Sequence, residues 1–87
     1  MKFVAIDIET VNGQATSVAV IGCVGMDYGG RVIETKEFRI RPFPFEFDDR
    51  STAINGLSKT DFVNCPSFSE IWDDFQNFIL DYDFCVA

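Results

Sequence analysis

The strongest local signal in the sequence is a helix start near the C-terminal end, and it limits how the segments on either side of the helix can connect. Ser67 is a candidate N-cap, Pro66 precedes it, and Glu70 stands three residues later, which is the spacing of a capping box. The apolar residues after this start recur at helical spacing: Ile71, Trp72, Phe75, Phe78, Ile79 and Tyr82. This pattern predicts an amphipathic helix whose apolar stripe, tryptophan included, packs into the core.

The segments around this helix have the composition of strands. Residues 2–9 form an almost continuous apolar run, which predicts a central strand covered on both faces. Residues 17–26 predict a second strand, residues 27–30 a hairpin turn, and the alternating residues 31–41 a more exposed antiparallel strand. Residues 83–87 predict the start of a fourth strand, which a helical crossover brings back beside the first and parallel to it. The predicted fold class is therefore α/β: three antiparallel strands, a helix, then a strand parallel to the first.

The segment 42–66 between the third strand and the helix has no regular pattern. A short helical turn near residues 50–54 is expected to end at Asn55 and Gly56. Phenylalanine recurs at every second position, at Phe43, Phe45 and Phe47. This alternation is compatible with a stacking platform for unpaired bases, but packing within a loop is the favoured interpretation.

Composition excludes several classes of protein. The chain has 87 residues and forms one small domain at most. Its 47% hydrophobic and 15% aromatic residues exclude a disordered acidic tail, and no apolar run approaches the ~18 residues of a membrane helix. Seven basic residues against fourteen acids exclude nucleic-acid binding through bulk positive charge. A nucleic-acid enzyme that binds through metal ions is still compatible with this balance, because a metal ion inverts the local charge.

The cysteine and histidine content excludes further kinds of site and reaction. The three cysteines, Cys23, Cys65 and Cys85, are far apart and lack a Cys-x-x-Cys spacing, which favours buried reduced thiols in a cytosolic protein. Asp7 interrupts the first apolar run and argues against a secretory signal, so a cytoplasmic location without membrane contact is expected. Histidine is absent, which removes His-based triads and most zinc chemistry from these residues.

Two acids on the first predicted strand, Asp7 and Glu9, are the candidate chemical feature. Residues i and i+2 of a strand point to the same face, with Cα atoms about 6.6 Å apart. Two carboxylates on an otherwise apolar strand repel each other and are costly to desolvate, and a divalent cation such as Mg²⁺ or Mn²⁺ removes both costs. The tripeptide alone favours a solvated strand end. The apolar strand before it, Thr10 after it and the apolar residues 21–24 favour the metal site.

Taken in order, several pieces of the sequence resemble the N-terminal half of a DEDD-type 3'→5' exonuclease, similar to the proofreading epsilon subunits of DNA polymerase III. The matching pieces cover the chain at residues 3–10, 20–24, 38–42, 54–57, 65–68 and 84–87. The resemblance implies a ribonuclease H-like fold and two-metal hydrolysis of phosphodiester bonds, with Mg²⁺ or Mn²⁺ as cofactor.

The resemblance also implies roles for individual residues. Asp7 and Glu9 correspond to catalytic metal ligands. Ile8 and Thr10 belong to the segment that lies against the terminal nucleotide. Asn55 and Leu57 correspond to one wall of the site, where the apolar residue packs against the terminal base. The family often has histidine at the position of Asn55, so the resemblance does not establish a side-chain contact there.

Two further catalytic aspartates and the general base, His or Tyr, lie beyond the equivalent of Ala87 in the family. Residues 1–87 are therefore expected to be the N-terminal part of a single exonuclease domain that breaks off within the fourth strand. On this basis the isolated chain is expected to be inactive and to bind metal weakly, since affinity follows ligand count. The implied partners are the 3' end of a single-stranded nucleic acid and a DNA polymerase subunit.

Two alternatives stand beside this interpretation. The first is a non-catalytic α/β module that binds a protein, or a second copy of itself, through an exposed apolar edge. The second is an exonuclease that acts on RNA ends, because residues that contact the 2'-hydroxyl cannot be located in the sequence.

Overall fold

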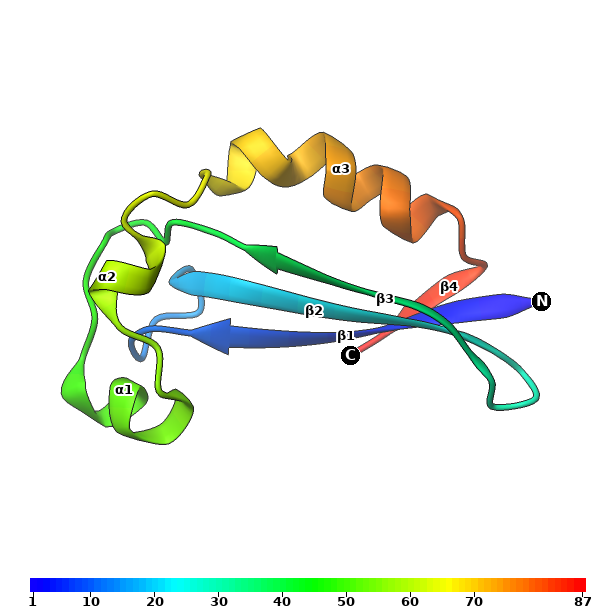
Figure 1. Ribbon diagram of the computed structural model, residues 1–87, viewed down its shortest axis with the longest axis horizontal. Helices are drawn as coiled ribbons and strands as arrows, with labels where there is room; N and C mark the ends of the chain where they lie inside the picture. Colours follow the sequence, from blue (N-terminus) through cyan, green and yellow to red (C-terminus); the bar gives the residue numbers. More distant parts are fainter.

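Four strands form a single mixed sheet in the computed structural model, which describes all 87 residues. The strands are β1 (Lys2–Thr10), β2 (Val18–Asp27), β3 (Val32–Arg39) and β4 (Phe84–Val86), in the spatial order β3-β2-β1-β4. β1 pairs antiparallel with β2 and parallel with β4 (Figure 1). This arrangement confirms the predicted α/β class and the return of the last strand beside the first.

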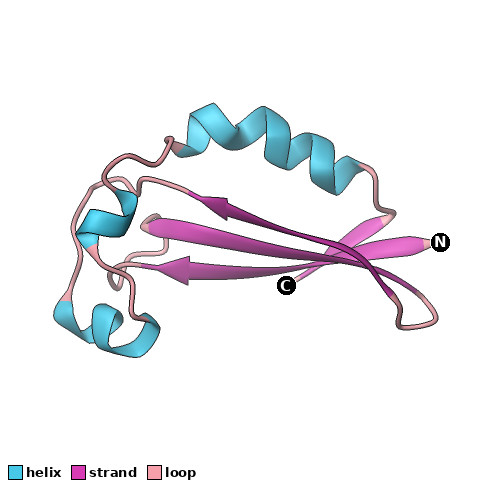
Figure 2. Cartoon of the chain, in the orientation of Figure 1, coloured by secondary structure: helices cyan, strands magenta, loops and turns pink.

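Three helices complete the chain: α1 (Asp49–Asn55), α2 (Lys59–Phe62) and α3 (Phe68–Leu80). α3 crosses one face of the sheet, while α1 and α2 gather at the end where β1 finishes (Figure 2). Helix α3 begins as predicted: the Glu70 amide donates to Ser67 Oγ (3.3 Å), and the Ser67 amide donates to Glu70 Oε1 (3.0 Å). No helix here combines the length and the hydrophobicity that crossing a bilayer requires.

The connection between β3 and α3 contains more helix than the sequence predicted. α1 is the expected helical turn; it begins after Asp48, whose carboxylate accepts from the Ser51 amide, and ends at Gly56 in the left-handed region (φ 73°). α2 was not predicted, because four residues are too few to show a helical period. Its local signal was the spacing of Ser58 and Asp61, which form a second capping box.

The main core lies between the sheet and α3, and a smaller one lies near α2. The main cluster consists of Val4, Ile21, Cys23, Phe38, Ile40, Ile71 and Tyr82. The smaller cluster consists of Val11, Ala19, Val20 and Phe62, with Phe45, Phe47, Leu57 and Cys65 packed against it. Because successive residues of a strand alternate between faces, the even-numbered residues of β1 face α3 and the odd-numbered residues face away. We call the face away from α3 the open face.

Several sequence-based expectations about burial are wrong. β1 is central in the sheet but not covered on both faces, since Val4 is its only buried residue. Trp72 is 42% exposed rather than part of the core, because it stands at the margin of a helical stripe centred on Ile71. Of the three thiols only Cys23 is buried; Cys65 is half-buried and Cys85 is exposed, although all three are free as expected.

The three alternating phenylalanines divide between packing and exposure. Phe45 and Phe47 pack against the smaller cluster, with ring centroids 5.1 Å apart. The packing interpretation is therefore confirmed for these two. Phe43 is 85% exposed and does not follow it.

A buried tyrosine joins the end of α3 to the far edge of the sheet. Tyr82 Oη donates to Glu34 Oε1 of β3 at 2.7 Å. Burial, with a contribution from this hydrogen bond, raises the pKa of Tyr82 from 10.0 to about 12. The folded state therefore holds the phenolic proton more tightly than the unfolded state does.

We expect the protein to lose stability between pH 10 and pH 12 because of Tyr82. In this window the unfolded chain has released the proton and the folded chain has not, so the free energy of unfolding falls by on the order of 2 kcal/mol as pH rises. Below pH 10 this contribution is fully present. Urea unfolding at pH 9 and pH 11 measures the effect, with Tyr82→Phe as the matched variant. An equally steep decline in Tyr82→Phe would contradict the assignment.

Candidate functional site

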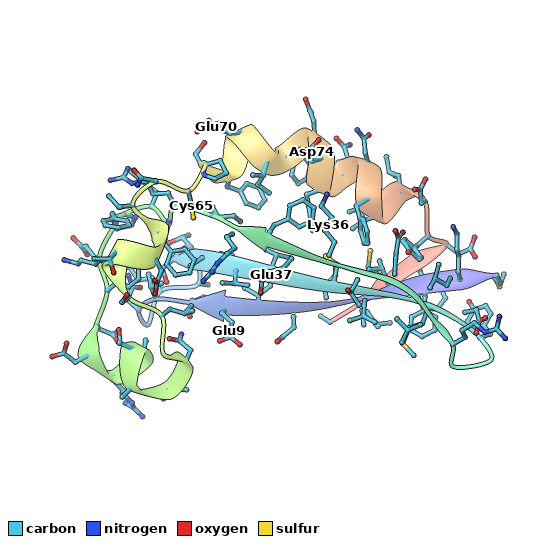
Figure 3. The ribbon with its side chains drawn as sticks, viewed as in Figure 1. Glu9, Lys36, Glu37, Cys65, Glu70 and Asp74 are labelled. Atoms are coloured by element: carbon cyan, nitrogen blue, oxygen red, sulfur yellow. The ribbon has the colours of Figure 1, made fainter.

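Asp7 and Glu9 lie on the open face of β1, as their i, i+2 spacing predicted. Val4, on the same strand, packs in the main core beneath α3, so the side chains of odd-numbered residues point the opposite way. Figure 3 shows Glu9 on the side of the sheet away from α3. Asp7 is exposed and Glu9 is half-buried. Both carboxylates can therefore meet a ligand that approaches this face from solvent.

The sheet register sets what stands beside the two acids. Asp7 lies opposite Gly22 of β2, and Gly22 lies opposite Glu37 of β3. Because Gly22 has no side chain, an open depression of about 430 Å³ lies over it, lined by Ala5, Asp7, Val24, Thr35 and Glu37 among others. Between Asp7 and β3, the surface of β2 at Gly22 therefore carries no side chain.

Asn55 ties the α1–α2 connection to the end of β1. Its Nδ2 donates to the Thr10 carbonyl at 2.8 Å, and its Oδ1 accepts from the Leu57 amide at 3.0 Å. Leu57 in turn packs against the smaller cluster, which includes Val20, the residue opposite Glu9. The structure thus brings Thr10, Asn55 and Leu57 together at the same end of β1 as Glu9.

The geometry changes two of the expected roles. Each end of the Asn55 amide is engaged with a backbone group, so this side chain fixes the Leu57 segment to Thr10. Ile8 is 51% exposed and lines an apolar groove beneath α3 with Phe68, Phe75 and Val86. Its side chain therefore lies on the opposite face of the sheet from the two acids, and only its backbone lies between them.

Replacing Asn55 with alanine is expected to loosen the site. The variant loses two hydrogen bonds that cross to backbone groups, each contributing about 1 kcal/mol. We expect a lower unfolding temperature, because the Leu57 segment is no longer fixed to Thr10. Thermal unfolding measures this effect. The exposed Asn77→Ala variant on α3 serves as the control, and equal unfolding temperatures for the two variants would contradict this role.

The donor chemistry of the two acids fits a hard divalent cation. Carboxylate oxygens are the ligands that Mg²⁺ prefers, and Mg²⁺ is usually bound through one or two of them, with water and phosphate oxygens in the remaining positions. No group of three or more metal-binding side chains gathers anywhere in these residues. Two carboxylates are fewer protein ligands than a complete site for such a cation provides.

The chain is similar in sequence to one family of known proteins. The family model described as Exonuclease (RNase T) matches residues 4–86. The chain belongs to this exonuclease family. No curated protein sequence matches it.

Solved structures place this exonuclease chain in a shared fold. Cell-death related nuclease 4 (CRN-4) matches with a TM-score of 0.77 at 15% identity, over 97% of this chain and 34% of that chain. A full-length 3'-exonuclease matches with a TM-score of 0.72 at 13% identity, over 88% and 28%. A 3'-exonuclease described in 3'-end recognition of a histone mRNA stem-loop matches with a TM-score of 0.71 at 12% identity, over 88% and 38%.

These matches confirm the ribonuclease H-like exonuclease fold that the resemblance implied. The family model is described as that of exonucleases, which as a class are hydrolases. The chain spans about a third of the length of each solved structure. The sequence did not reveal the depression over Gly22 or the structural role of Asn55, because both depend on which residues face each other across strands and loops.

Proposed function

We propose that this chain forms the N-terminal part of a metal-dependent exonuclease domain that hydrolyses phosphodiester bonds at the 3' end of single-stranded DNA. The main support is that Asp7 and Glu9 share the open face of the central strand of an exonuclease-family chain, beside the open depression over Gly22. The 3' direction is supported by two structural neighbours that are described as 3'-exonucleases. The coverage of about a third of each neighbour supports a longer functional domain.

Each residue of the site has a proposed task. Asp7 and Glu9 hold Mg²⁺ or Mn²⁺. When bound, such a cation supplies Lewis-acid stabilisation of charge on the scissile phosphate. Thr10 and Leu57 form the wall against which the terminal nucleotide lies, with Leu57 offering an apolar surface to the base. Asn55 keeps this wall in place through its two backbone hydrogen bonds.

The remaining catalytic groups are proposed to come from residues outside this chain. Histidine is absent from the sequence, so a histidine general base cannot be supplied here. Asp7 and Glu9 provide two carboxylates, and a complete two-metal site needs more oxygen ligands than these. The 87-residue chain alone is therefore expected to be inactive.

The test is an end-labelled hydrolysis assay with the full-length protein. Single-stranded DNA labelled at its 5' end is expected to give a ladder of products shortened by single nucleotides from the 3' end, in Mg²⁺ or Mn²⁺ but not in EDTA. Matched DNA and RNA strands decide the substrate, and faster hydrolysis of RNA would move the proposal to RNA ends. Internal cleavage products, or full activity in EDTA, would refute it.

A proofreading role beside a DNA polymerase subunit in the cytoplasm is the finer form of this proposal, and it is supported by the resemblance of residues 3–10 and 54–57.

The alternative is a non-catalytic module that associates with a second copy. It has its own supporting observation, the apolar groove of about 440 Å³ between the sheet and α3. Sedimentation of a protein without nuclease activity would show a dimer if the alternative is correct.

A further inference from the structure

Two arginines lie at the end of β3, on the far side of the sheet from β4. Arg39 lies opposite Val20, and Val20 lies opposite Glu9, so the three form one row across the sheet. Arg39 alternates with the buried Phe38 and Ile40, which face α3, and therefore projects on the same open face as Glu9. Arg41 follows two residues later, and both arginines are exposed.

Both guanidinium groups are held against aromatic rings. Arg39 Cζ lies 4.8 Å from the centroid of Phe62, and Arg41 Cζ lies 4.6 Å from the centroid of Phe45. Phe47 connects the two rings, at 5.1 Å from Phe45 and 6.2 Å from Phe62. The two cations thus stand at the ends of one row of three aromatic rings.

The three aromatic rings of this row are held in place by packing in the smaller cluster. Phe62 is fully buried in the smaller cluster, and Phe45 and Phe47 pack against it. The Arg41 amide donates to the Pro66 carbonyl at 2.8 Å, which fixes the backbone as the strand ends. The arginine side chains are therefore already restricted before a ligand binds, so binding costs less conformational entropy.

Stacking leaves the hydrogen-bonding capacity of the arginines free. A ring covers the flat face of a guanidinium, whereas its N–H donors point outward from the edge in the geometry that binds phosphate oxygens in pairs. In a chain with seven basic and fourteen acidic residues, two cations held against one row of rings, with Arg39 on the face that carries the acidic pair, are a local exception.

We propose that Arg39 and Arg41 bind the phosphates of a single-stranded nucleic acid behind its 3' end. This inference rests on the proposed function and extends it from the terminal bond to the strand that leads into it. Two strand spacings, about 10 Å, separate the Glu9 and Arg39 backbones, and the proposal assigns Arg39 to a phosphate other than the scissile one. The contact is with the backbone and is independent of base identity.

The first test measures binding with the full-length protein and a fluorescent single-stranded DNA of about ten nucleotides, in EDTA to prevent hydrolysis. The double variant Arg39→Ala/Arg41→Ala is compared with Arg31→Ala, which removes a cation near the hairpin at the far end of the sheet (Figure 1). We expect the slope of log K against log salt to fall by about 1.4 for the double variant, since each neutralised phosphate contributes about 0.7. An unchanged slope would overturn the inference.

The second test separates this inference from the proposed function. For active protein, the double variant should raise KM for the ten-nucleotide strand by about tenfold while leaving kcat, and the hydrolysis of a dinucleotide, unchanged. The double variant Arg39→Lys/Arg41→Lys should keep the salt slope of the unmodified protein but only part of its affinity. Lysine keeps the charge but lacks the planar guanidinium, which packs on a ring and binds two phosphate oxygens at once. If the protein hydrolyses neither substrate but the double variant still changes the salt slope, the proposed nuclease function is refuted and the proposed phosphate contact is supported. Equal loss on both substrates would refute the contact.

Discussion

Asp7→Asn in the full-length protein is expected to lower kcat/KM for single-stranded DNA by about 10³-fold or more. Asparagine has nearly the shape of aspartate but carries no charge, so it is a weaker ligand for a hard cation. A 10³-fold loss corresponds to about 4 kcal/mol of transition-state stabilisation, which matches the several kcal/mol that a bound cation contributes. The assay is hydrolysis of 5'-labelled DNA across a series of Mg²⁺ concentrations.

Folding should be preserved in this variant, because the Asp7 side chain is exposed on the open face. Asp73→Asn makes the same chemical change at an exposed position of α3 and should leave activity unchanged. Mn²⁺ binding, followed by calorimetry, should weaken for Asp7→Asn and not for Asp73→Asn. Full metal-dependent activity in Asp7→Asn would show that the carboxylate is not part of the catalytic site.

The largest effect on stability is expected from Gly25→Ala. Gly25 lies on β2 beneath the Tyr82 ring, and a Cβ built there would overlap the Tyr82 hydroxyl and ring atoms. Tyr82 cannot simply turn away, since it is buried in the main core and bonded to Glu34. Overpacking of this kind costs about 1–3 kcal/mol, and each kcal/mol lowers the unfolding temperature of a domain this size by roughly 4–8 °C.

Gly13→Ala is the matched control for this prediction. A Cβ at Gly13 meets no atom within 4 Å, so the same chemical change should leave thermal unfolding nearly unaffected. Thermal unfolding followed by circular dichroism compares the two variants directly. If Gly25→Ala unfolds at the same temperature as Gly13→Ala, Tyr82 does not pack over Gly25.

Local signals in the sequence predicted the elements whose stabilisation is itself local. The capping box at Ser67 predicted the start of α3, because its hydrogen bonds join residues three apart. The glycine-rich turn predicted the β2–β3 hairpin, and the helical crossover predicted that β4 would lie parallel to β1. The spacing of Asp7 and Glu9 likewise placed both on one face, because alternation along a strand does not depend on the rest of the fold.

By itself, then, the sequence determined the order of the four strands and of α3, the parallel return of the last strand, and a pair of carboxylates on one face of the central strand. Only the tertiary structure decided that this face is open, that Gly22 leaves a depression beside Asp7, and that Ile8 belongs to the opposite side. It also decided that Asn55 bonds to the Thr10 carbonyl and that Arg39 shares a row with Glu9. These features depend on the register between strands and on contacts between residues far apart in the sequence, such as that of Asn55 with Thr10, 45 positions apart. Such contacts are set by packing of the whole chain, which no local spacing encodes.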